Sequence, residues 1–149
     1  MHGLTLFPQV DALCMKYLVD ANVLSEPTKA VSVQQAVDWL NENEAELVVS
    51  PVVMGEIWRG VEAMPEGRKK QELVAWFGRP RARMPSLERT TEIALVWAEM
   101  VNQIRRSGCT VGIMDTMIAA TAKRHGLIVA TRNVSDFSRC GVAVVNPFE

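Results

Sequence analysis

The sequence predicts an α/β fold in which a central parallel sheet is sandwiched between helices. Short apolar runs alternate with segments of helical periodicity along the chain, which is the pattern of parallel strands joined by helical crossovers. The 149 residues, of which 48% are hydrophobic and 22% charged, suit one domain with a substantial core. No repeat, low-complexity segment or linker interrupts the pattern, so a single domain over residues 15–149 is expected.

Residues 1–14 stand apart from this domain. They show no clear period, and Met15-Lys16 is a more natural start. We interpret them as an N-terminal extension, either the product of an upstream start codon or added expression sequence, and leave them out of the fold prediction.

The first half of the domain predicts two strands and two helices. The β-prone run 17–19 ends in Asp20, and residues 31–43 carry apolar side chains at helical spacing. Residues 47–49 form a second short strand. Ser50-Pro51 is a strong helix start, with a capping serine and a proline at the first helical position, so a helix over 51–63 begins where that strand ends.

The middle of the chain predicts two more helices. Residues 68–78 are amphipathic, and the basic, proline-interrupted segment 79–83 is expected to be a loop. Residues 84–87 are predicted as a brief strand, and residues 90–106 as a long helix. Its tryptophan and methionine stripe is expected to face the core or an oligomer partner.

The last part predicts the most informative helix. It runs over 115–125 and ends at Gly126, where a left-handed residue is favoured. Residues 127–130 read as a buried strand, residues 131–136 as a polar loop, and residues 141–145 as the final strand.

Asp115 breaks the apolar stripe of its helix. Residues one turn apart share a helix face, so Asp115 lies in line with Ile118, Ala119 and Ala122, which should face the core. An unpaired carboxylate there is costly and needs a cation, a hydrogen-bonding cap or protonation. The plain alternative is that Asp115 is the N-cap of its helix.

Asp20 and Glu56 raise the same question. Asp20 directly follows the first strand, where functional residues of α/β proteins often lie, although it could simply be a turn aspartate that caps the next helix. Glu56 lies one turn from Val52 and Val53, at the border of the buried stripe. Its alternative is a surface ion pair with Arg59.

Strand–helix junctions of a parallel sheet gather at one edge. We therefore expect Asp20, Glu56 and Asp115 to share that edge, with Asn133 and Asp136 reaching it from the segment after residues 127–130. Oxygen ligands suit Mg²⁺ or Mn²⁺, and such an ion would relieve the repulsion among close carboxylates. The expected chemistry is hydrolysis of a phosphodiester bond.

Composition limits the alternatives. The net charge of −1 excludes a uniformly basic nucleic-acid coat, and three cysteines without a CxxC motif favour a reducing compartment over a zinc site. Without a membrane-length apolar run or a signal peptide, we expect a cytoplasmic protein with no membrane association.

The motifs, in order and spacing, resemble those of PIN-domain ribonucleases, and in particular the VapC/FitB-like toxin branch. The resemblance covers about residues 16–148. It is carried by Leu18-Val19-Asp20-Ala21-Asn22-Val23-Leu24-Ser25-Glu26, Val53-Met54-Gly55-Glu56-Ile57-Trp58-Arg59-Gly60, Asp115-Thr116-Met117-Ile118-Ala119-Ala120-Thr121-Ala122, Ala130-Thr131-Arg132-Asn133 and Asn146-Pro147-Phe148.

The resemblance implies a PIN-like three-layer sandwich with a central four- or five-stranded parallel sheet, over residues 15–149. It implies a Mg²⁺-dependent (or Mn²⁺-dependent) endoribonuclease that acts as the toxin of a type II toxin–antitoxin pair. Members are commonly dimeric and are neutralised by a small DNA-binding antitoxin. We therefore expect RNA as the substrate, such an antitoxin as partner, and a homodimer or a larger assembly with it.

By position, the resemblance makes Asp20 and Asp115 the main metal ligands and Glu56 a third acid that holds the metal or its water. It implies that Thr131 and Asn22 form hydrogen bonds within the acidic cluster.

Two positions depart from the family pattern. Ala21 stands where the first motif usually has threonine, and Asn133 stands where close relatives often carry a fourth acid. Asp136 could replace that acid from the same segment, and we count it among the catalytic candidates. The number of metal ions, one or two, stays open.

The RNA phosphates are expected to meet basic side chains of the second half of the chain, namely Arg68, Lys69, Lys70, Arg81 and Arg132. Two rival functions remain. One is a PIN-like module that binds RNA or protein with weak or no catalysis, and the other is a DNA nuclease or phosphatase that uses the same metal chemistry.

Overall fold

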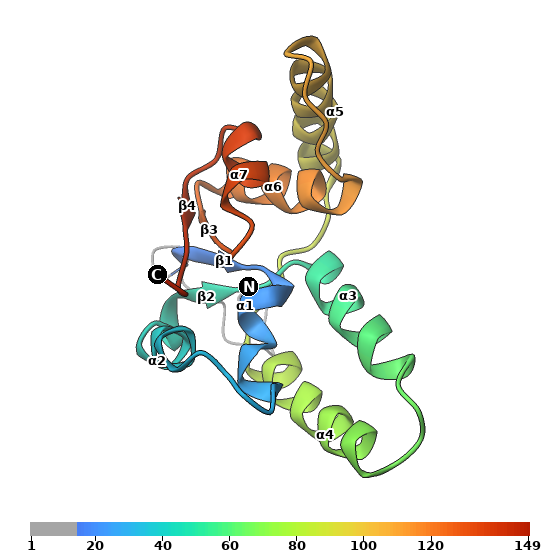
Figure 1. Ribbon diagram of the computed structural model, residues 1–149. Coiled ribbons are helices and arrows are strands. Elements are labelled where there is room, and N and C mark those ends of the chain that lie inside the picture. The colour runs from blue at the N-terminus through green and yellow to red at the C-terminus, as the bar shows by residue number, and fades with distance from the viewer. Residues whose placement is uncertain (1–14) are drawn as a thin grey trace, which may run out of the picture.

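The computed structural model describes residues 15–149, so the extension predicted for residues 1–14 lies outside the described part of the chain. Four strands form one parallel sheet in the order β2-β1-β3-β4 (Figure 1). Their bounds are β1 (Tyr17–Val19), β2 (Leu47–Val48), β3 (Ile128–Ala130) and β4 (Val144–Val145). The register pairs Val19 with Ala130, and Ala130 with Val145. The α/β fold with a parallel sheet is confirmed, with four strands.

Helices connect and cover these strands. They are α1 (Ala21–Leu24), α2 (Gln34–Glu42), α3 (Pro51–Glu62), α4 (Arg68–Arg83), α5 (Thr91–Arg106), α6 (Ile113–His125) and α7 (Val134–Arg139), with short 3₁₀ turns at Glu26–Thr28 and Glu44–Glu46. Figure 1 shows α3 and α4 lying together as an arm on one side of the sheet, and α5 standing out beyond α6.

Local signals set several helix ends. The Ser50 side chain accepts the Val52 N–H at 3.2 Å and Pro51 opens α3, because a capping oxygen satisfies a free amide of the first turn. Gly126 ends α6 in the left-handed region, with φ 65°, where a side chain would be strained.

The core lies between the sheet and the helices. Leu18, Val48 and Val129 of three neighbouring strands are fully buried, as are Ile118 of α6 and Phe137 of α7. Burying the last two packs α6 against β3 and α7 against α6 and β4, and so holds α6 beside the sheet.

The predicted loop over 79–83 is wrong, because α4 runs on to Arg83 with Pro80 inside it. Proline removes one helical hydrogen bond and disfavours the helical conformation of the residue before it. Here the loss falls in the last turn, where the Pro80 carbonyl still accepts the Met84 N–H at 2.9 Å. Phe77 is buried one turn earlier, against Trp58 of α3. Packing therefore overrides the proline.

Three other predicted elements are shorter than expected. The strand predicted over 84–87 is a single bridge, in which Val49 pairs with Ser86. The last strand has two residues rather than five. The helix predicted over 31–43 begins only at Gln34, and Val33, predicted to lie on its apolar face, is exposed.

Within residues 15–149, no helix combines the length and apolar character that crossing a membrane requires.

Candidate active site

The carboxyl ends of β1 and β3 place two polar residues side by side. Asp20 directly follows β1 and Thr131 directly follows β3. Because the two strands are parallel neighbours, the Asp20 N–H donates to the Ala130 carbonyl at 2.9 Å. The Thr131 hydroxyl then donates to Asp20 Oδ2 at 2.7 Å, across 111 residues of sequence. The sheet therefore builds this contact directly.

The Asp20 carboxylate is buried and hydrogen-bonded on both oxygens. It is 4% exposed, and Oδ1 accepts the Ala21 N–H at 2.8 Å, which makes Asp20 the N-cap of the short helix α1. Oδ2 accepts the Thr131 hydroxyl and the Asn22 amide. Oδ1 therefore has the helix-capping role of the alternative reading. Oδ2 belongs to a hydrogen-bond network that joins residues far apart in sequence.

Thr131 and Asn22 hold this network together. Thr131 is fully buried, and its hydroxyl oxygen accepts the Asn133 N–H at 3.0 Å and the Asn22 amide at 3.3 Å. The Asn22 carbonyl oxygen in turn accepts the Arg132 N–H at 3.1 Å. Both residues therefore lie where the resemblance placed them, in hydrogen-bond contact within the acidic cluster.

Asp115 lies in the first turn of α6, but it is not the N-cap. That position is Gly112, and no side chain caps the helix, so the capping alternative is wrong. Asp115 Oδ2 accepts the side-chain amide of Asn133 at 2.9 Å. The same amide donates to Asp136 Oδ2 at 3.0 Å. Asn133 therefore bridges the two acids.

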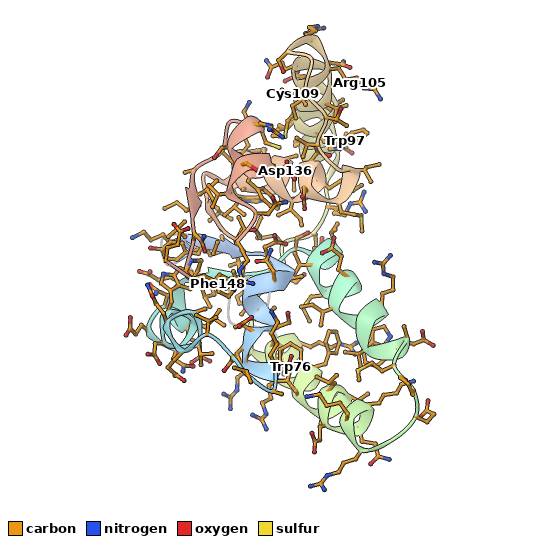
Figure 2. All side chains as sticks on the ribbon, viewed as in Figure 1. Trp76, Trp97, Arg105, Cys109, Asp136 and Phe148 are labelled. Atoms are coloured by element: carbon orange, nitrogen blue, oxygen red, sulfur yellow. The ribbon has the colours of Figure 1, made fainter. Side chains whose placement is uncertain are left out.

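Asp136 lies in the first turn of α7, so the prediction that residues 131–136 form a loop is wrong for its last part. Its other oxygen pairs with Arg139 at 3.3 Å. Figure 2 labels Asp136 on this helix. An acid at a helix start is favoured by the helix dipole, which gives the segment a local reason to become helical.

Glu56 is the third predicted acid, and it approaches the cluster from α3. Burial, and then the negative charges of Asp20 and Asp115, raise the pKa of its carboxyl group, while the charge of Arg59 lowers it. Glu56 therefore lies within electrostatic reach of both acids. The surface alternative does not hold, because no ion pair between Glu56 and Arg59 forms in the described part of the chain.

The acids share one electrostatic problem. Burial raises the pKa of Asp20 above its ordinary range, and hydrogen bonds from Thr131, Ala21 and Asn22 only partly offset it. Burial, and then the charges of Asp20 and Asp136, raise the pKa of Asp115. Burial is also the main cause of the raised pKa of Glu56. A bound cation would offset both burial and repulsion, because an opposite charge close to the carboxylates favours their ionised form.

The donor set fits a hard divalent ion through few direct ligands. Across residues 15–149, no three acidic, histidine or cysteine side chains are drawn together closely enough to enclose a metal ion. Mg²⁺ differs from zinc here, because it keeps several waters and takes only one or two carboxylates directly. The oxygen donors of Asp20 and Asp115, with Glu56 beside them, therefore suit Mg²⁺ or Mn²⁺.

Two residues near the site were assigned no role from the sequence, although Glu26 belongs to the first motif of the resemblance. Glu26 is 1% exposed, and its carboxylate accepts the Val33 N–H at 2.9 Å and pairs with Lys29 at 2.8 Å. The bond to Lys29 is the main cause of its lowered pKa. Cys140 packs behind the acids, where burial and then the charges of Asp115 and Asp136 raise its thiol pKa to about 11. Neither position is marked by periodicity, because both depend on tertiary packing.

Most of the predicted RNA contacts on α4 already have partners. Arg68 pairs with Glu72 and Lys70 pairs with Glu66, while Lys69 donates to the Thr28 carbonyl at 3.0 Å. Arg81 lines a groove of about 440 Å³ beside Trp58 and Phe77.

Arg132 is the fifth predicted contact, and its side chain stacks on a ring. The guanidinium lies 3.7 Å above the centre of Phe148, and the backbone beside it carries Thr131 and Asn133 of the acidic network.

Comparisons with known proteins find relatives that match this chain in sequence and in fold. The model of the PIN domain family matches residues 17–142. A VapC ribonuclease of Sinorhizobium fredii is 32% identical over 136 residues, which is 89% of this chain and 97% of that protein. Toxin FitB of Neisseria gonorrhoeae is 33% identical over 135 residues, covering 88% and 97%. The structure of FitAB bound to a DNA fragment superposes with a TM-score of 0.80 at 29% identity, covering 89% and 96%.

Proposed function

Because this chain belongs to the PIN domain family, we propose that it is a Mg²⁺-dependent endoribonuclease and the toxin of a toxin–antitoxin pair. The observation that carries the proposal is the state of Asp20. Its carboxylate is buried among neutral donors, forms no ion pair within residues 15–149 and has two further acids within electrostatic reach. A site that holds negative charge in this way is built to receive a cation.

The substrate class follows from the relatives. VapC of Sinorhizobium fredii is a ribonuclease by name, and FitB of Neisseria gonorrhoeae is a toxin by name. Both align with nearly the whole of this chain, so the region that contains Asp20, Glu56 and Asp115 is the region they share. RNA is therefore the substrate to test first.

Each acid has a separate task in this proposal. Asp20 and Asp115 hold the metal, and Thr131 and Asn22 keep the Asp20 carboxylate aimed at it. Glu56 lies on α3 and would hold the metal or its bound water. When bound, the ion would lower the pKa of that water and neutralise charge on the phosphate oxygens. Asn133 donates its side-chain amide to both Asp115 and Asp136. These two hydrogen bonds reduce the repulsion between the two carboxylates.

The test is cleavage by the purified full chain. We expect cleavage of RNA in Mg²⁺ or Mn²⁺ and none in EDTA. Asp20→Asn and Asp115→Asn should abolish it, while Asp38→Asn, a change of the same chemistry on exposed α2, should leave it intact. Variants that stay as active and as growth-inhibitory as the wild type would favour the binding-module alternative. Cleavage of single-stranded DNA but not of transfer or messenger RNA would overturn the RNA assignment.

The partner and assembly form a second part of the proposal. We place the protein in the cytoplasm with its RNA substrate, as a homodimer or a larger assembly with a small DNA-binding antitoxin. The FitAB structure, itself bound to DNA, supports this pairing. Co-expression with the neighbouring open reading frame should relieve growth inhibition and yield a stable complex. Growth that stays inhibited with that product present would contradict it.

The domain boundary is also open to test. We propose that residues 15–149 hold the whole catalytic domain. A chain that begins at Met15 should then keep the RNA cleavage and the melting temperature of the full chain. Loss of either would assign residues 1–14 to the domain.

A further inference from the structure

The last residues of the chain contact the acidic edge of the sheet through the stack of Arg132 on Phe148. The guanidinium of Arg132 lies 3.7 Å above the centre of the Phe148 ring (Figure 2, where Phe148 is labelled). At this distance the central carbon of the guanidinium is in van der Waals contact with the face of the ring, with the cation on the negative face of the ring. Arg132 is nonetheless exposed as a residue, so the contact with Phe148 leaves part of it open to solvent.

Both halves of the stack are held by the backbone. The Thr131 N–H donates to the Val145 carbonyl at 3.0 Å, which sets the segment after β3 beside the segment after β4. Asn146 accepts the Phe148 N–H on its side-chain oxygen at 3.0 Å and so fixes the final turn. Arg132 is held from the other side, where Asn22 accepts its N–H. The stack is therefore part of the fold rather than a chance contact of two long side chains.

The stack adjoins the acids. Arg132 lies between Thr131, which donates to Asp20, and Asn133, which donates to Asp115. Within the described residues Arg132 forms no direct ion pair. Its charge reaches the Glu26 carboxylate, whose ion-pair partner is Lys29. A positive, planar and exposed surface thus sits next to a site that would hold a scissile phosphate.

We propose that the Arg132–Phe148 stack is a platform for an unpaired nucleobase of the RNA, next to the phosphate that is cut. This rests on the proposed ribonuclease function and adds to it a subsite for one unpaired base, formed by Arg132 and Phe148. Unpaired bases are recognised by stacking on aromatic rings and on arginine planes. A phosphate would need only the charge of Arg132, whereas a base needs its plane, and it is the plane that Phe148 holds fixed.

The experiment measures binding apart from hydrolysis. The full chain is titrated, in EDTA, into a short fluorescent single-stranded RNA and into an abasic strand of the same length and charge. Two variants remove the platform. Arg132→Lys keeps the charge and loses the plane, and Phe148→Leu keeps an apolar side chain and loses the ring. Arg124→Lys, on the exposed last turn of α6, is the matched control.

We expect both platform variants to bind the base-containing RNA at least about fivefold more weakly, which is the lower end of what stacking of one base contributes. Their affinity for the abasic strand, and that of Arg124→Lys for either strand, should stay at the wild-type value. Thermal unfolding checks each variant. If Phe148→Leu is destabilised, Arg132→Lys decides alone, since it leaves the ring in place.

Two results would overturn the proposal. One is wild-type affinity of Arg132→Lys for the base-containing strand. The other is an equal loss on both strands, which would make Arg132 a phosphate contact only. In either case Mg²⁺-dependent RNA cleavage by the wild type would leave the ribonuclease proposal standing. A wild-type chain that neither binds nor cuts RNA would instead remove both.

Discussion

The two sides of the acidic cluster are built to different degrees. On the β1–β3 side, Asp20 is buried and accepts three hydrogen bonds, from Ala21, Asn22 and Thr131. On the helical side, Asp115 is half-buried and accepts a single bond from Asn133. Glu56 is half-exposed, and burial and neighbouring charges, rather than hydrogen bonds, determine its pKa. Order therefore falls from the sheet edge outward to α3.

This difference has a physical source and a functional consequence. Backbone pairing between β1 and β3 sets the positions of Asp20 and Thr131, whose short side chains have few rotamers. The Glu56 carboxylate is instead at the end of a longer side chain on a separate helix. A cation would find one ligand already aimed and would draw in the others. The sheet edge should then determine whether the metal binds, and the helical side how well the reaction runs.

The strongest way to break the comparison is to remove the charge of Asp20. We expect Asp20→Asn to lower kcat/KM for RNA by more than about a hundredfold, because losing even an outer partner of a metal ligand costs about 10–100-fold. The melting temperature without metal should rise, since the desolvation of the charged carboxylate outweighs its hydrogen bonds, including the one that an amide NH2 can no longer accept. A variant that is inactive but also less stable would contradict this account of the burial.

Removing the hydroxyl that aims Asp20 is the next largest change. Thr131→Val should cost about 10–100-fold in metal affinity or activity, as for other supports of metal ligands. Thr131→Ser keeps the hydroxyl and should recover most of the loss. Calorimetric titration with Mn²⁺ separates the two, and equal affinities for both variants would show that Thr131 only fills space.

Glu56 tests the less ordered side. We expect Glu56→Gln to lower kcat by about tenfold, at the low end of that range, and to leave the affinity for Mn²⁺ close to that of the wild type. Steady-state kinetics with calorimetry on the same variant give both values. Loss of metal binding as severe as in Asp20→Asn would remove the distinction between the two sides.

The smallest expected effect is on the pH dependence of stability. The pKa values of Asp20, Glu56 and Asp115 are raised in the folded chain, so it holds protons that the unfolded chain has released. Without metal, their contribution to the free energy of unfolding falls as the pH rises from the ordinary carboxyl range, near 3.8–4.5, through the raised pKa values. Mg²⁺ binds the deprotonated acids, so its stabilising effect should grow over the same window.

Thermal unfolding with Mg²⁺ or with EDTA, across that pH range, checks this. Glu26 works in the opposite sense, because its pKa is lowered and its stabilisation is lost as the pH falls through that value. It lies outside the cluster and should contribute equally with and without metal. A Mg²⁺ effect of constant size at every pH would contradict the raised pKa values.

Local chemistry was enough to predict much of the fold. Ser50-Pro51 and Gly126 marked helix ends that the structure confirms. Prediction was wrong where distant packing decided the outcome. Pro80 marks a helix end by local rules, yet the buried Phe77 keeps α4 intact beyond it. Of the predicted last strand, only Val144 and Val145 pair with β3. An apolar run in the sequence does not show which of its residues will pair with a neighbouring strand.

The site shows the same limit. The rule that strand–helix junctions share one edge was enough to predict that Asp20, Glu56 and Asp115 lie near one another. It could not show that Asn133 bridges Asp115 and Asp136, because that depends on side-chain direction. Nor could it show the stack of Arg132 on Phe148, which needs the register of β3 against β4.

The most direct test of the account is a crystal structure of the full chain with Mn²⁺, which is located by its anomalous scattering. We predict one peak at the β1–β3 edge, in direct contact with the carboxylates of Asp20 and Asp115, and with Glu56 reaching it directly or through one water. A peak bound elsewhere, with Asp20 free of metal in a protein that still cuts RNA, would contradict the account.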